Sequence, residues 1–294
     1  SFATRTIVIA LMNQNTIFEY DLHIHTTNSD GELSLEALTE HAIDCGLKGI
    51  AITDHDAVGS REQMEFVNYS PLDIIPGIEF ATDIANMHLV AYMKDWNNSS
   101  LMGFLKEQRA ARTAAAEETL KRALSLGIAL DWDVLVKDYA KDSPVGRPHI
   151  AKYLVDKGHA ETVPDAFVRY LGKNRPLYVR KKRYPFARII DLAKNEFNII
   201  IGLAHPYLID GDPARIKELI NKCVELGIDG IEVHYSGHTE QQIRYLEEIC
   251  STHGLLMFGG SDFHGRSIKP DVSLGDGGVF LKDFNLLNDA LRRL

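Results

Sequence analysis

The chain has 294 residues, of which 45% are hydrophobic and 25% are charged, and its formal net charge is −9. This is the composition of a globular protein, and the length suits one large α/β domain with or without a smaller insert. The negative charge argues against broad electrostatic binding of nucleic acid, but allows a local basic patch or an anionic substrate held by metal ions. No apolar run approaches the roughly 20 residues of a membrane helix, so we expect no membrane contact.

The first residues and the cysteines bear on the location of the protein. Residues 1–12 are mildly apolar but too short for a secretory signal, and they lack a convincing cleavage site. They are either a strand-like lead-in or foreign to the native chain. The cysteines Cys45, Cys223 and Cys250 are far apart and lie in helical patterns. This arrangement indicates reduced thiols in a cytoplasmic protein.

In chain order, the first expected element is a strand at residues 20–25. Residues 35–55 then predict an amphipathic helix that stops at Gly46, followed by a short apolar strand that ends in Asp54 and His55. Further strands are expected at 73–80 and 87–93. Strands that alternate with helices imply parallel pairing.

The alternation breaks between residues 99 and 185. Residues 101–126 predict a long, alanine-rich and charged helix, and shorter helical pieces follow between prolines. We therefore expect a barrel formed by residues 13–98 and 186–294, interrupted by a mostly helical insert at 99–185. Such insertions lie on the loops above the active face of a barrel, where they shape substrate access.

After the insert, the helix–strand pattern returns. A strand is expected at 199–205, and residues 216–234 and 241–264 each predict a helix, a glycine stop and a strand. These strands end in histidine or carboxylate as well. The total is about seven strands, which is enough to close a barrel.

The strongest local signal is the pair His23 and His25, followed by Asp30. Residues i and i+2 of a strand face the same side, so the two imidazoles lie next to each other. The ends of parallel strands meet on one rim of a barrel, so the polar residues at the other strand ends should converge there too. Imidazole and carboxylate without cysteine suit Mn, Zn or Fe at a catalytic site. These further residues are Asp54, His55, Glu79, His88, His205, Asp262 and His264.

In its ordered motifs the chain resembles the PHP (polymerase and histidinol phosphatase) superfamily, over about residues 20–280. Histidinol phosphatases usually carry histidine at the position of Asp30, and this difference makes the chain similar to the small PHP phosphoesterases that act on nucleotides. The insert, with Arg147-Pro148-His149 and Gly172-Lys173, also looks like that subgroup. The matching motifs are His23-Ile24-His25 with Asp30-Gly31, Thr53-Asp54-His55, Gly77-Ile78-Glu79, His88, Ala204-His205-Pro206 and Ser261-Asp262-Phe263-His264.

The resemblance implies a distorted (β/α)7 barrel that binds three divalent metal ions. Asp21 and Asp54 are expected behind the ligands, where each would orient a neighbouring histidine. The implied ligands are His23, His25, Glu79 and Asp262 for the first metal, the bridging Glu79 with His88 and His205 for the second, and Asp30, His55 and His264 for the third.

Further side chains are candidates for contact with the substrate. Arg147 fits a phosphate through its guanidinium fork, and Lys173 could contact a second phosphate. His149 could bind phosphate or protonate the leaving oxygen, and His234 could line the pocket as a proton donor. The basic run 180–183 is either a solvated face or a contact to a polyphosphate or short oligonucleotide.

The sequence therefore predicts a metal-dependent phosphoesterase in which a metal-bridging hydroxide attacks a phosphomonoester of a nucleotide or nucleotide bisphosphate. Mn is the favoured metal, with Zn and Fe as options. One alternative is a 5'-3' exoribonuclease that acts on short RNA. Another is a non-catalytic, metal-bound PHP module of a larger replication assembly, although every expected ligand type is present and no polymerase is attached.

Overall fold

The computed structural model describes residues 18–59, 71–140, 145–179, 183–210 and 212–294. The predicted lead-in at residues 1–12 and the first residues of the predicted barrel, 13–17, lie outside the described residues. Its strands form one sheet of seven, whose order follows the sequence. The α/β barrel prediction is confirmed, since each strand overlaps a predicted one. The strands are β1 (Tyr20–Ile24), β2 (Gly49–Ile52), β3 (Asp73–Ala81), β4 (His88–Tyr92), β5 (Ile200–Leu203), β6 (Gly230–Tyr235) and β7 (Leu256–Gly260).

The sheet is mixed, so the expectation of parallel pairing throughout was wrong. Strand β4 runs antiparallel to both β3 and β5, while all other neighbours are parallel. The connection from Ala81 to His88 is too short for the helical crossover that parallel strands require. As a consequence, the start of β4 lies at the rim where β3 and β5 place their polar residues.

The barrel is nearly closed by a strip of chain near the C-terminus. Gly278 donates a backbone hydrogen bond to His234, and Val279 and Tyr20 exchange backbone hydrogen bonds of 2.8 and 3.2 Å. A Cβ atom on Gly277 would lie 2.1 Å from the carbonyl oxygen of Gly260. Only glycine fits this close approach of two backbones.

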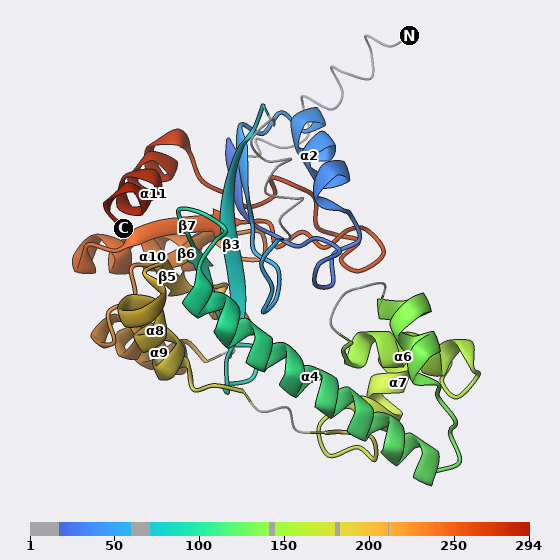
Figure 1. Cartoon of the computed structure of the whole chain (residues 1–294). Coiled ribbons are helices and arrows are strands. Elements are labelled where there is room, and N and C mark those ends of the chain that lie inside the picture. Colours follow the sequence, from blue (N-terminus) through green and yellow to red (C-terminus); the bar gives the residue numbers. More distant parts are fainter. Residues whose placement is uncertain (1–17, 60–70, 141–144, 180–182, 211) are drawn as a thin grey trace, which may run out of the picture.

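Helices cover the outside of the sheet, as Figure 1 shows. Leu38 of α2, Ile220 of α9 and Leu246 of α10 are fully buried and belong to the main core. Among the described helices, none is long and apolar enough to span a membrane. The helices around the barrel are α2 (Leu35–Asp44), α8 (Phe186–Leu192), α9 (Pro213–Glu225), α10 (Glu240–His253) and α11 (Leu281–Arg293), with a π-helical turn at η3 (Ala193–Phe197) and a 3-10 turn at η4 (Pro206–Leu208).

The inserted segment begins with the long helix α4 (Ser99–Ser125) and builds a hydrophobic cluster of its own. Leu101 and Phe104 of α4 pack into the barrel core, whereas Leu120 and Ala123 pack into the second cluster. Figure 1 shows α4 running from the sheet to the helices of the insert. These are α5 (Trp132–Val134), α6 (Arg147–Asp156) and α7 (Val163–Ala166), with π-helical turns η1 (Leu135–Ala140) and η2 (Phe167–Leu171).

Candidate active site

The predicted metal ligands lie where strands end or, for His88 in β4, where a strand begins. His205 follows β5 and Asp262 follows β7, and both have a positive φ, of 26° and 58°. Such backbone is rare outside glycine, is destabilising by about 1–3 kcal/mol, and is typical of functional sites. The fold thus holds these two side chains in positions that an ordinary strand end would not give.

Glu79 of β3 is the centre of the cluster. Its side chain is buried, and five imidazole rings surround its two oxygens. The nitrogen–oxygen distances are 2.8 Å from His205 Nε2 and His88 Nδ1 to Oε1, and 2.8, 3.2 and 3.4 Å from His55 Nδ1, His25 Nε2 and His23 Nε2 to Oε2.

Two aspartates extend this cluster. Asp262 Oδ1 lies 3.3 Å from both His25 Nε2 and His264 Nδ1. Asp30 Oδ1 lies 3.5 Å from His264 Nε2 and 3.6 Å from His25 Nδ1, and its Oδ2 lies 3.8 Å from His55 Nε2. All nine ligands expected from the sequence therefore lie in one connected group.

The arrangement of these atoms fits metal ions. Several buried nitrogen and oxygen atoms approach one another without hydrogen bonds of good geometry within the described chain, which is unusual for buried polar groups. Divalent ions bound there would lower the pKa of bound water and neutralise charge on a phosphate. The atoms are His23 Nε2, His25 Nε2, Asp30 Oδ1, His55 Nδ1, Glu79 Oε2 and His88 Nδ1.

The cluster also distributes its protons unevenly. Burial raises the pKa of Glu79, but His55 and the other imidazoles outweigh this and hold it well below the usual range. Burial lowers the pKa of His25, but the carboxylates of Asp262 and Glu79 next to its Nε2 raise it to about 10. Burial and the charge on His25 lower the pKa of His264 to about 3. Without metal, His25 therefore keeps a proton at neutral pH.

Glu232 of β6 belongs to this site, although the sequence assigned it no role. Its Oε1 lies 3.0 Å from His23 Nδ1, and its Oε2 accepts a hydrogen bond of 2.7 Å from the backbone N–H of His205. The side chain is fully buried. A carboxylate that accepts from Nδ1 fixes the ring so that Nε2 can bind a metal. The available signal was a charged residue within an apolar strand.

Among the described residues, neither Asp21 nor Asp54 hydrogen-bonds directly to a histidine ring, so any orientation of a histidine is indirect. Asp21 accepts from the backbone N–H of His23 at 3.3 Å, and Ser29 lies between Asp54 and His25. Asp21 accepts hydrogen bonds of 2.9 Å from the backbone amides of Ser261 and Gly275, because those loops close over the start of β1. Asp54 instead holds the loop that carries Asp30. Its donors are Thr26 N at 2.8 Å and the hydroxyls of Thr26 and Ser29 at 2.6 Å, and the Ser29 hydroxyl lies 3.4 Å from His25 Nδ1.

His234 lies away from the other candidates. Its Nε2 is 3.9 Å from Glu247 of α10, and its ring centre is 5.6 Å from that of Phe18. The pairing of β6 with β7 shifts register between Glu232 and His234. Such an irregularity changes the direction of the following side chain, so His234 does not share the face of Glu232, and we do not retain it as a proton donor.

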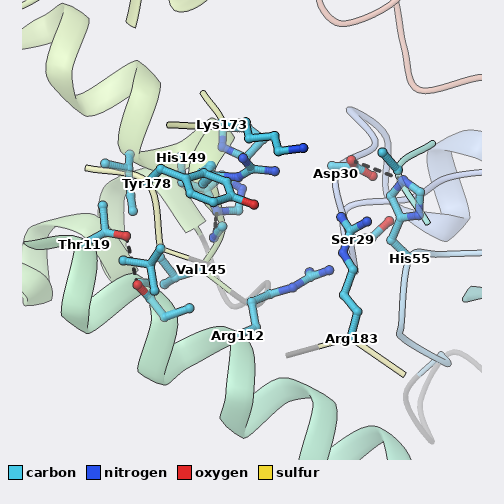
Figure 2. A pocket seen from close by; sticks show the side chains of 18 of the residues that line it. Ser29, Asp30, His55, Arg112, Thr119, Val145, His149, Lys173, Tyr178 and Arg183 are labelled. Carbon is cyan, nitrogen blue, oxygen red and sulfur yellow. Dashed lines mark hydrogen bonds and ion pairs between the residues drawn. The ribbon is translucent and has the colours of Figure 1, made fainter. Parts of the chain in front are cut away.

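A cavity of about 740 Å³ opens beside Asp30, His55 and His88. Most of its other lining residues come from the insert, among them His149, Lys173 and Tyr178 in Figure 2, while Ser29, Asp83, Ala85 and Asn86 belong to barrel loops. Three of the substrate-binding candidates line it, together with one arginine of the predicted basic run and one arginine that the sequence did not single out, Arg112. The cationic and histidine side chains from this side are Arg112, Arg147, His149, Lys173 and Arg183.

Within the described residues, each arginine of the cavity donates one hydrogen bond to the protein. A guanidinium has five N–H donors, so each keeps donors for a ligand. Residues 180–182 of the basic run lie outside the described residues. The contacts are Arg112 Nη2 to Asp56 Oδ2 at 3.3 Å, Arg147 Nη1 to the Leu171 carbonyl at 3.3 Å, and Arg183 Nη1 to the Thr82 carbonyl at 3.1 Å.

The site combines imidazole and carboxylate groups, which suit divalent ions, with cationic side chains, which suit phosphate. Together these features define a metal-dependent phosphoric ester hydrolase. Comparison with known families agrees with this class. Residues 21–211 match the model of the PHP domain, and the chain belongs to this family.

Relatives of known name support the same class. The chain is 30% identical to the 5'-3' exoribonuclease Rnm of Salmonella typhimurium, over 87% of this chain and 88% of the relative. It is 26% identical to the 3',5'-nucleoside bisphosphate phosphatase of Chromobacterium violaceum, over 83% and 86%. A Bifidobacterium adolescentis protein assigned to the metal-dependent phosphoesterases superposes with a TM-score of 0.78 and 29% identity, over 94% of this chain and 98% of that one. The protein is an enzyme rather than a non-catalytic module.

Proposed function

We propose that the enzyme hydrolyses a phosphate ester of a nucleotide that carries a second phosphate, and that a nucleotide bisphosphate is the simplest substrate. The observation that carries this proposal is the charge of the cavity. Among the described residues, its lining contains four cationic side chains and only two acidic ones, Asp30 and Asp83, in a chain whose net charge is −9. A cavity of this charge favours a substrate with more than one anionic group.

The ligand set supports three metal ions, with Mn as the favoured metal because imidazole and carboxylate occur without thiolate. Candidate ligand atoms within 4.8 Å of one another form overlapping groups. In this proposal Glu79 belongs to two metals, and His205 and Asp262 complete the set. The groups are His25, Asp30, His55 and His264; His23, His25 and Glu79; His55, Glu79 and His88; and His23, His205 and Glu232.

The insert, proposed to span residues 99–185, would recognise the part of the substrate that does not react. Arg147 and Lys173 would bind the second phosphate, and their binding energy would raise the rate at the reacting phosphorus. The side chain of Arg147 is already positioned, because its guanidinium lies 5.6 Å from the ring centre of Tyr178. The three free cysteines support the proposed cytoplasmic location.

Trimming of short RNA from its 5' end is the second candidate. A 5'-phosphorylated RNA also presents two phosphate groups, a terminal monoester and the first phosphodiester. Arg183, the last residue of the basic run, lines the cavity, which favours this candidate. The similarity to the exoribonuclease Rnm supports it as well.

The test compares kcat/KM for an aryl phosphate, a mononucleotide, a 3',5'-bisphosphate and a short 5'-phosphorylated RNA. We expect the bisphosphate to exceed the aryl phosphate by at least about tenfold, as one charged hydrogen bond to the second phosphate would give. Equal values for all small substrates would reject the recognition role of the cavity. A clear preference for the RNA would place exonucleolytic trimming first.

A further inference from the structure

His149 stands at the third position of helix α6, and its ring takes part in capping that helix. The backbone N–H of Gly146, the residue before the helix, donates a hydrogen bond of 3.2 Å to His149 Nδ1. The backbone N–H of His149 donates in return to the carbonyl of Gly146, at 3.1 Å. In a capping box, the side chain that accepts from the backbone N–H of the residue before the helix is a glutamate or glutamine at the third position. Here the imidazole replaces them.

This cap determines where the ring carries its hydrogen. A nitrogen that accepts a hydrogen bond has no proton, so neutral His149 carries its hydrogen on Nε2. Because the ring lines the cavity, Nε2 is the polar atom that remains for a ligand. A second proton would have to be placed on Nδ1, where it would face the N–H of Gly146 and break the cap.

The charges around the ring also disfavour the imidazolium form. Burial lowers the pKa of His149, and Lys152 on the same helix and Arg112 on α4 lower it further, while Asp30 raises it. Asp30 is one of the candidate metal ligands, and a bound cation would cancel its effect. An imidazole without its second proton is not a useful acid near neutral pH, because donating its remaining proton would leave an imidazolate.

We propose that His149 binds a phosphate of the substrate as a hydrogen-bond donor of fixed tautomer, through Nε2–H, and does not protonate the leaving oxygen. This inference rests on the proposed function, because it assumes that the cavity holds a phosphorylated substrate. It separates two roles that the sequence alone left open for this residue.

Two substitutions keep the hydrogen bond from Gly146 and change only the chemical group that the side chain presents to the cavity. In His149→Gln, the amide oxygen accepts from Gly146 and the amide nitrogen still donates, but the side chain cannot transfer a proton. In His149→Glu, a carboxylate also accepts from Gly146 but presents a negative charge to the phosphate. We expect kcat/KM of the glutamine variant to stay within about tenfold of wild type, since one neutral donor replaces another. The glutamate variant should lose about 10- to 150-fold or more, as loss of a charged hydrogen bond does.

Both variants and wild type are loaded with Mn²⁺ and compared on a 3',5'-bisphosphate, with melting temperature and metal content as controls. The pH profile of the glutamine variant should coincide with that of wild type. An acid role would instead cost the glutamine variant roughly 10²- to 10⁴-fold. If kcat/KM of the glutamine variant fell as far as that of the glutamate variant, the proposal would be overturned. Wild-type kinetics in both variants would overturn it as well.

Binding of inorganic phosphate to the same preparations, measured by calorimetry, separates this inference from the proposed function. Wild type and His149→Gln should bind phosphate equally, and His149→Glu at least about tenfold more weakly. This result would stand even if no nucleotide substrate were hydrolysed, which would reject the proposed function alone. Equal binding by all three proteins would show that His149 does not contact phosphate.

Discussion

Replacing Glu232 with glutamine tests whether this carboxylate orients a metal-binding histidine. Glu232 accepts hydrogen bonds from two donors, the Nδ1 of His23 and the backbone N–H of His205. An amide has only one oxygen, and the backbone donor cannot change its direction. The oxygen of the introduced amide would therefore turn to His205, and its NH2 group would face His23 Nδ1.

The expected magnitude follows from that exchange. Opposite an NH2 group, His23 is most stable with its hydrogen on Nε2, which is the atom that faces Glu79 at 3.4 Å and would bind metal. For Nε2 to bind a metal, the ring hydrogen must move to Nδ1, where it faces the NH2 group of the introduced glutamine. Placing these two buried donors opposite each other costs about 1.5–3 kcal/mol, the value of the lost charge-assisted hydrogen bond. This corresponds to about 10- to 150-fold in metal affinity, similar to the 10- to 100-fold typical of groups that support metal ligands.

The assay is a competition titration of the apo-protein against a chromophoric chelator with Mn²⁺, with circular dichroism as the control for folding. Glu247→Gln is a matched control, because Glu247 is 42% exposed and its carboxylate lies 3.9 Å from His234, which is not part of the cluster. It should leave the affinity unchanged. Wild-type metal affinity in a folded Glu232→Gln protein would refute the role given to Glu232.

Four further expectations concern the cluster and the cavity. Glu79→Gln should reduce turnover by roughly 100- to 1000-fold in a folded protein, since it removes a buried charge that faces five imidazoles; near-wild-type turnover with full metal occupancy would reject this. Chelation should abolish activity and Mn²⁺ should restore it best, and activity in protein shown to be metal-free would contradict the mechanism. Arg147→Ala should lower kcat/KM on a bisphosphate by about 10- to 150-fold with metal content unchanged, and unchanged kinetics on every ester would exclude the contact. Metal binding should release protons, and the metal affinity should rise as the pH increases from neutral toward about 10, because the metal displaces the proton held by His25, whose pKa is raised to about 10. Calorimetry in buffers of different ionisation enthalpy would measure the proton release, and zero release would disprove the expectation.

The strands and the ligands were predictable because both depend on local patterns. Short apolar runs located all seven strands, three of them after a glycine that ends a helix, and the pair His23 and His25 follows from the alternation of side chains along a strand. The prediction that distant residues converge depended only on the ends of strands sharing one rim. It remained correct for His88, although for a different reason, because β4 is antiparallel and contributes its first residue rather than its last.

The residues that the sequence did not reveal depend on tertiary structure. Arg112 lies in the middle of a long charged helix, where nothing separates it from the solvent-exposed residues around it. Its position at the cavity follows only from the direction of α4. Glu232 and His234 stand at the end of the same predicted strand, and the register shift between them in β6 turned one into the cluster and the other away from it.

Helix α4 explains how a cavity between the barrel and the insert can select a substrate. Its first turns are anchored in the barrel core through Leu101, and its last turns in the core of the insert through Leu120. Between these anchors, Arg112 pairs with Asp56, which follows His55 in the chain. The backbone N–H of Asp56 donates a hydrogen bond of 2.9 Å to the carbonyl of Glu79. The helix therefore joins the insert to the loop that carries His55, a candidate metal ligand. Because Leu101 and Leu120 are buried in the two cores, α4 fixes the separation between the cluster and the cations of the insert. In the proposed function, the two phosphates of the substrate would span this separation.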